Sequence, residues 1–118
     1  MEEIVRRALA SALWGKLCDA IELECSQVNS GAEKRRLAVE RKPFSLTVKD
    51  LKTEKTLSLS YQEDTPWIVC RHSGKPESKI TFRAERIPDP VPVLTLMLNG
   101  LPWITQDLAL QLVVTLTH

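Results

Sequence analysis

The chain has 118 residues, of which 43% are hydrophobic and 26% are charged, the balance of a globular domain with one core. This length suits a single domain over residues 1–118 and is short for two. Three cysteines without a CxxC pair argue against a secreted disulfide scaffold, and the acidic start Met1-Glu2-Glu3 lacks the order of a signal peptide. We therefore expect a cytoplasmic protein without a membrane partner, since polar residues also interrupt the apolar region 91–116.

The net charge is +1, but basic and acidic residues are unevenly distributed along the chain. Between Lys34 and Arg86 lie 13 of the 16 basic residues against 7 acidic ones. The two flanks together carry 3 basic and 8 acidic residues. This asymmetry predicts a basic surface formed by the middle of the chain and acidic elements at both ends.

Residues 2–29 are predicted to form a long amphipathic helix. Apolar side chains recur there at steps of three and four, which places them on one stripe facing a core. They are Val5, Leu9, Leu13, Leu17, Ile21 and Cys25. Glu2 and Glu3 suit the positive end of the helix dipole, and Asn29-Ser30-Gly31 predicts where the helix ends.

The middle of the chain alternates apolar and polar residues, which predicts β-strands with one buried and one wet face. The expected strands cover residues 37–41, 44–49, 57–61, 67–74 and 80–84. Short turn-forming clusters separate them, and such connections join neighbouring antiparallel strands. The alternation places the aromatic rings of Phe44, Tyr61 and Phe82 in the core.

The last third begins with a proline-rich linker over residues 87–92. Residues 93–98 predict a strand that is apolar, and therefore covered, on both faces, and Asn99-Gly100 predicts a tight turn. Residues 105–118 fit a helix or an alternating strand, and we favour a helix capped by Thr105. The expected fold is a two-layer α+β domain, in which an N-terminal and a C-terminal helix pack on one face of an antiparallel meander of about five strands.

The segment WIVCRHSG (67–74) places Cys70 and His72 on the same face of a strand. A thiolate–imidazole nucleophile also needs an orienting group and an oxyanion donor, and zinc needs further ligands; no motif supplies either. Cys18 and Cys25, two helical turns apart, are expected in the core. The chain also lacks the P-loop, GxGxxG, GxSxG and HExxH motifs, so we expect no enzyme, no cofactor and no metal.

The preferred functional prediction is protein–protein contact, as a homodimer or as an adaptor for another protein. Trp103 follows the Asn99-Gly100 turn in an expected loop, where it can anchor an interface or plug the end of the core. Trp67 is the second candidate contact residue. A second copy of the chain could also cover the outer face of residues 93–98.

Two other kinds of ligand are possible. The first is nucleic acid, bound weakly by basic side chains of the wet sheet face and its flank. The candidates are Lys34, Arg35, Arg36, Lys49, Lys79 and Arg83. Base stacking would require exposed aromatic rings, and the alternation leaves only Trp67 for that role. The second is a small apolar molecule between helices and sheet, in a pocket that Trp14, Trp67, Met97 and Trp103 would either line or fill.

Overall fold

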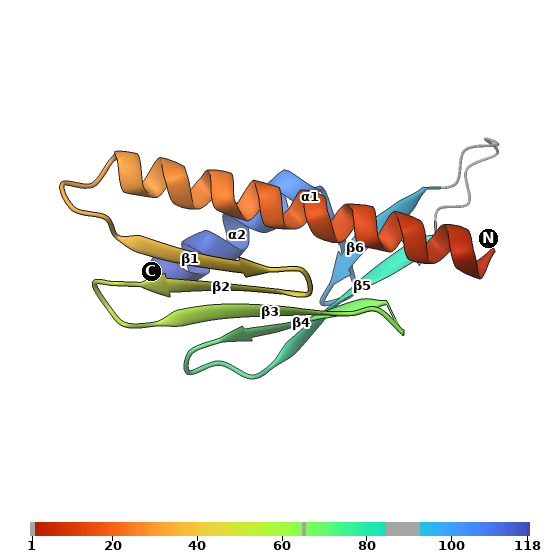
Figure 1. Cartoon of the computed structure of the whole chain (residues 1–118). Coiled ribbons are helices and arrows are strands. Elements are labelled where there is room, and N and C mark those ends of the chain that lie inside the picture. Colours follow the sequence, from red (N-terminus) through yellow and green to blue (C-terminus); the bar gives the residue numbers. More distant parts are fainter. Residues whose placement is uncertain (1, 65, 85–92) are drawn as a thin grey trace.

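A computed structural model describes residues 2–64, 66–84 and 93–118 as two helices and one seven-stranded antiparallel sheet. The helices are α1 (Glu3–Ser30) and α2 (Thr105–Thr117). The strands are β1 (Leu37–Lys42), β2 (Ser45–Asp50), β3 (Thr56–Gln62), β4 (Trp67–His72), β5 (Ser78–Ala84), β6 (Leu94–Leu98) and β7 (Leu101–Trp103). Both helices pack on the same face of the sheet (Figure 1), which confirms the expected α+β class; the sheet has seven strands where about five were predicted.

The sheet is a simple meander, in which every strand pairs antiparallel with the next one along the chain. The register keeps apolar positions in rows: Leu59 lies opposite Leu46 and Cys70, and Ile80 lies opposite Ile68 and Leu98. These rows form the inner face, which the helices cover. The side chains between them form an outer face that no helix in the described part of the chain covers.

Helix α1 runs over the sheet close to the predicted bounds. Of the predicted stripe it buries Leu17, Ile21 and Cys25, while the residues nearer its N-terminus, Val5, Leu9 and Leu13, are partly exposed. Its 28 residues span about 42 Å at 1.5 Å per residue. Trp14 anchors it, because its ring stacks on Tyr61 at 5.6 Å and its Nε1 donates to the Pro43 carbonyl at 2.9 Å. Among the described residues, neither helix combines the length and the apolar character that crossing a membrane requires.

The terminal segment is a helix, as predicted, because it buries residues at helical spacing and not every second residue. The buried residues are Leu108, Ala109, Leu112, Val113 and Leu116. The predicted cap was wrong: Ile104 occupies the N-cap position without a side-chain bond, and Thr105 is already the first helical residue. Burial of the apolar face, and not capping, therefore accounts for this helix.

The structure corrects two burial predictions. Phe44 is 53% exposed, while Tyr61 and Phe82 are buried as predicted. Phe44 lies in the two-residue turn between β1 and β2, so the strand alternation does not extend to it. Residues 93–98 are covered on one face only: Leu94, Leu96 and Leu98 are buried, but both helices lie on that same side. The predicted linker 87–92 lies outside the described residues.

Candidate functional site

Strand β7 is placed by a tight turn at the edge of the sheet. The sequence predicted a tight turn here, and Asn99 and Gly100 both have positive φ, 55° and 75°, as in a type I′ hairpin turn. The turn folds β7 back on β6, so that Leu101 pairs with Leu98 and Trp103 with Leu96. Trp103 therefore lies on a short strand and not in the predicted loop.

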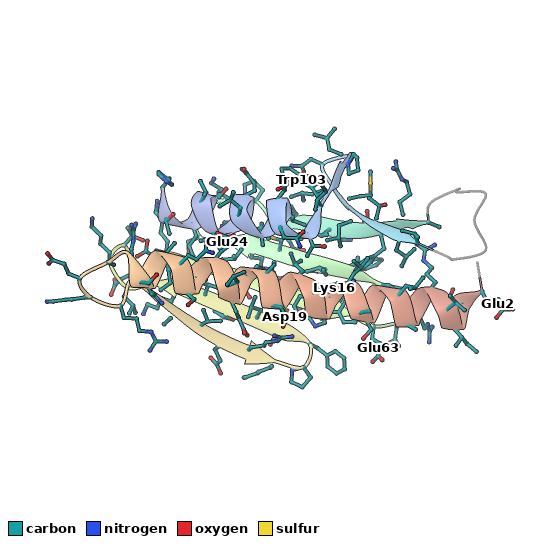
Figure 2. All side chains as sticks on the ribbon, turned by 90° about the horizontal axis from the view of Figure 1, so that it is seen from above. Glu2, Lys16, Asp19, Glu24, Glu63 and Trp103 are labelled. Atoms are coloured by element: carbon teal, nitrogen blue, oxygen red, sulfur yellow. The ribbon has the colours of Figure 1, made fainter. Side chains whose placement is uncertain are left out.

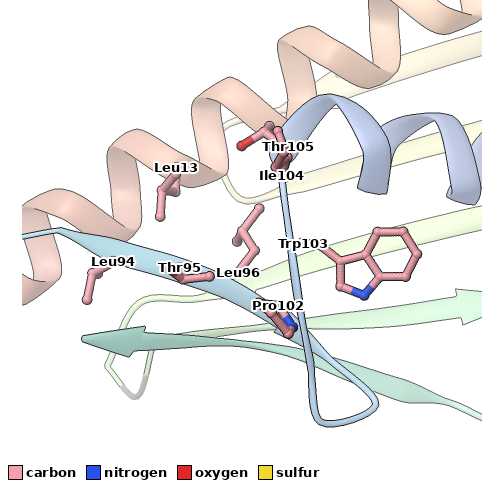
Figure 3. Close-up of a pocket in the computed structure, with 8 residues that line it drawn as sticks. All are labelled: Leu13, Leu94, Thr95, Leu96, Pro102, Trp103, Ile104 and Thr105. Carbon is pink, nitrogen blue, oxygen red and sulfur yellow. The ribbon is translucent and has the colours of Figure 1, made fainter. Parts of the chain in front are cut away.

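A cleft of about 380 Å³ lies beside Trp103, between the first half of α1 and the β6–β7 hairpin (Figure 3). Its lining residues are Leu13, Leu94, Thr95, Leu96, Pro102, Trp103, Ile104 and Thr105. Six of these eight side chains are apolar. The volume is at the lower end of the range for ligand pockets and accommodates a large apolar side chain.

Two large apolar side chains flank this cleft in contact with water. Leu101 is 60% exposed and Ile104 is 67% exposed, one on each side of Pro102 and Trp103. Burial of such a side chain contributes about 1.5–3 kcal/mol. An apolar group of this kind, beside a hollow and at the edge of a sheet, is typical of a docking surface. We call Leu13 and Leu101–Ile104 the β7 surface.

Trp103 belongs partly to the core and partly to the cleft. Its ring is half-buried and packs against the core cluster, and the residue also lines the cleft. Its Nε1 is buried, and no residue in the described ranges accepts a hydrogen bond from it. A buried donor left without an acceptor costs about 1–3 kcal/mol, so this position is less well satisfied than Trp14.

Pro102 limits the kind of contact that the β7 edge of the sheet can make with another molecule. Because Leu98 and Leu101 close a two-residue turn, the backbone groups of Leu101 point toward β6 and those of Pro102 point away from it. Proline has no N–H, so the free edge lacks a donor at the middle of β7. Addition of a further strand is thereby disfavoured, and contacts at this edge must rely on side chains.

A second hollow, of about 540 Å³, continues the β7 surface between the two helices. It shares Leu13 and Thr105 with the first cleft and extends along α1 to Leu23, which is 57% exposed. Lys16 and Asp19 line its rim (Figure 2). The charged groups nearest to the apolar surface thus carry opposite signs.

The other predicted contact residue, Trp67, lies elsewhere. The register places it in an outer-face row with Thr81, Met97 and Pro102, whereas Trp103 is on the inner face. The Lys79 ammonium lies 4.4 Å from the centre of its ring, a cation–π contact. The structure therefore does not unite the two tryptophans in one site.

The six predicted basic residues also fail to form one patch. Lys49, Lys79 and Arg83 are exposed on the outer face, but β3 and β4 separate Lys49 from the other two by about 14 Å. Lys34, Arg35 and Arg36 follow α1 at one end of the molecule. There the Arg36 Nη2 donates to Asp50 Oδ2 at 3.3 Å and to the Thr117 carbonyl at 2.9 Å, a structural role.

The cysteine and histidine of β4 share the inner face, as predicted, but their surroundings differ. Burial raises the pKa of the Cys70 thiol to about 11, partly offset by a hydrogen bond with Ser78. Burial likewise raises the pKa of Cys18 to about 12 and of Cys25 to about 11. All three thiols are therefore protonated at neutral pH, which makes them poor nucleophiles. In the described part of the chain, no three His, Cys, Asp or Glu side chains are grouped as metal ligands.

Of the four residues proposed for an apolar ligand pocket, only Trp103 lines the cleft beside α1. Trp14 is buried in the core, and Trp67 and Met97 lie on the outer face. Leu101 and Ile104 were missed by the sequence reasoning. The signal was available: Leu101-Pro102-Trp103-Ile104 is a continuous apolar run directly after a turn, where polar residues are usual.

Comparison of the chain with protein-family models, with curated proteins and with solved structures finds no match.

Proposed function

We propose that this protein acts through protein–protein contacts, with the β7 surface as the docking site. The observation that supports this proposal is the pairing of exposed Leu101 and Ile104 with an open apolar cleft beside them. The edge presents side chains and no backbone donor at Pro102. Such a surface buries apolar area on association without extending the sheet.

The partner we propose is a second copy of the chain. The β7 surface offers both a protruding side chain, Ile104, and a hollow beside Trp103, so two copies related by a twofold axis can each fill the cleft of the other. An adaptor role for a different protein would use the same surface.

Light scattering on the purified protein tests self-association. We expect a mass of twice the 13.3 kDa chain, and we expect Ile104→Asp to give the monomer mass. The matched control is Ile4→Asp, since Ile4 is 81% exposed on α1 and remote from β7; this variant should remain dimeric. A monomeric wild type would overturn the homodimer, and dimers of both variants would place the interface elsewhere.

Chemical cross-linking gives a second, positional test. The native cysteines are all buried, so an engineered thiol is the one that a maleimide reagent meets first. Leu101→Cys should give dimers with a short bis-maleimide, because two copies of β7 then lie close together. Glu40→Cys, an exposed position on β1 at the opposite edge, should not. Equal cross-linking of both variants would contradict the proposed surface.

A second candidate function is weak binding of single-stranded nucleic acid on the outer face. The observation in its favour is the half-buried Trp67 under Lys79, which joins an aromatic ring to a cation on a hydroxyl-rich face. Binding of an oligonucleotide should then weaken steeply with salt and fall with Trp67→Leu. Absence of binding at 50 mM salt would remove this candidate.

A further inference from the structure

A separate pocket of about 280 Å³ lies at the other end of α2 from the β7 surface. There the last turn of α2 meets the loop before β3 and the loop after β4. The lining residues are Lys55, His72, Ser73, Lys75, Val114, Thr115, Leu116 and His118. None of them is used by the proposed protein contact.

Basic side chains predominate among the polar residues that line this pocket, and none of the lining residues is Asp or Glu. Lys55, His72, Lys75 and His118 supply four basic side chains from three different elements. Asp50 is the acidic residue next to Lys55, since its backbone N–H donates to the Lys55 carbonyl at 2.9 Å. Its two carboxylate oxygens, however, accept from Arg36 Nη2 at 3.3 Å and from the Lys52 N–H at 3.0 Å. The nearby carboxylate is thus already engaged, and the lysine charges remain available to a ligand.

His72 is the least exposed base of the group. Burial and, after it, the charge of Lys75 hold the pKa of His72 below its usual value, so the imidazole is neutral at pH 7. A neutral imidazole donates one hydrogen bond and gains a proton when an anion binds beside it. Ser73 is already engaged, because its Oγ accepts from the Thr56 N–H at 2.8 Å.

The C-terminal end of α2 repels a bound anion only weakly. The C-terminal end of a helix acts as roughly half a negative charge. The Thr117 carbonyl already accepts from Arg36, and the Val114 carbonyl accepts from the His118 N–H. The two lysine charges among the lining residues exceed the half negative charge of the helix end.

We propose that this pocket binds a phosphate monoester. Lys55, Lys75 and His72 would hold the phosphate group, since two permanent cations match a dianion and the imidazole adds a hydrogen bond. Val114 and Leu116 form an apolar wall on the α2 side, which suits the organic part of the ester. The ligand class is therefore a small phosphorylated molecule with an apolar group, in preference to free phosphate.

The experiment compares phenyl phosphate with inorganic phosphate at constant ionic strength, followed by NMR of the His72 ring. We expect phenyl phosphate to bind more tightly and to raise the pKa of His72. Lys55→Gln and Lys75→Gln should each weaken binding about tenfold. Lys34→Gln is the matched control, an exposed lysine outside the pocket, and should bind normally.

Three results would overturn this proposal. Unchanged His72 signals would show that the anion does not enter the pocket. Equal loss of binding in Lys34→Gln would show that the attraction is merely general surface charge. Equal affinity for phosphate and phenyl phosphate would remove the role of the apolar wall. Because His118 also lines the pocket, His118→Gln should retain the response of the His72 ring if His72 contacts the phosphate.

Discussion

The two edges of the sheet differ sharply in chemistry. β1 ends in the exposed charged run Glu40-Arg41-Lys42, and Arg41 reaches α1, where its Nη1 lies 2.6 Å from Asp19 Oδ1 and 3.5 Å from Glu22 Oε1. β7 has only three residues, and its exposed side chains are apolar.

Each edge is thereby protected against further strand pairing in its own way. At β1, the charged side chains disfavour pairing with a strand from another molecule. At β7, the short length and the missing N–H of Pro102 leave too few backbone groups for such pairing. Only β7 combines this protection with exposed apolar side chains and a cleft. The difference shows that an edge can be closed to strands and still be open to side-chain docking.

The largest expected effect on the free energy of unfolding is at Asp50, whose ion pair with Arg36 holds the start of β1 in place. Asp50 is fully buried and pairs with Arg36, the residue that leads into β1. Asp50→Ala should lower the free energy of unfolding by about 3 kcal/mol, the lower end for a broken buried pair because Arg36 keeps partial contact with water. Urea denaturation measures this change. Glu54→Ala, an exposed neighbour, is the control and should change the unfolding free energy little.

The same pair predicts a pH dependence. Burial tends to raise the pKa of Asp50, but hydrogen bonds from the Lys52 N–H and from Arg36 outweigh it and leave the pKa below the usual 3.8. A carboxyl whose pKa is depressed in the folded state contributes stability above 3.8, and this contribution is lost as the pH falls through its folded pKa. Melting temperatures between pH 5 and 2 should therefore fall less steeply in Asp50→Asn than in the wild type.

At the β7 edge, the packing of Trp103 should have the next largest effect. Trp103→Ala should lower the free energy of unfolding by about 2 kcal/mol, less than for a fully buried tryptophan because the residue is partly exposed. Trp103→Phe should retain most of the stability, since the buried Nε1 makes no bond to a described residue. A Phe variant as unstable as the Ala variant would show that the indole N–H has an acceptor after all.

The ion pairs of β1 should matter less for stability. Arg41→Ala should lower the free energy of unfolding by less than about 1 kcal/mol, because Arg41, Asp19 and Glu22 are all partly solvated. Salt should reduce the difference further, as it screens exposed pairs. A loss that persists in 1 M salt would indicate that Arg41 contributes by packing along α1 and not by charge.

The smallest effect on folding, and the largest on association, is expected at Ile104. Ile104→Asp should not lower the unfolding free energy of the monomer, because the side chain is already 67% exposed and aspartate is preferred over isoleucine at the N-cap position of α2. Denaturation at a concentration below the dimer dissociation constant isolates this quantity. A loss of several kcal/mol there would mean that Ile104 belongs to the fold and not to an interface.

Much of the fold was predictable because its signals are local. The periodic stripe of α1 and the strict alternation of β2, β3 and β5 predicted both element type and buried face correctly. The errors lie where a turn interrupts the pattern or where burial depends on a distant layer. Phe44 is in a turn, and Met97 has no covering element because α1 and α2 share one side of the sheet.

The candidate site was predictable only in part. The sequence pointed to Trp103 by residue type and to the turn before it by Asn99-Gly100. It missed the exposed pair Leu101 and Ile104, because exposure depends on which elements leave an edge uncovered. It also placed Lys55, Lys75 and His72 apart along the chain. The antiparallel pairing of β3 with β4 brings them together, and the end of α2 completes the pocket.

By itself, the sequence determined both helices and every strand but β7, because hydrophobic periodicity acts between residues close in the chain. The tertiary structure decided the rest: which edge is charged and which apolar, which face of the sheet is left bare, and which bases meet at the end of α2. These outcomes depend on contacts between residues far apart in the chain, for which the amino-acid sequence carries no local signal.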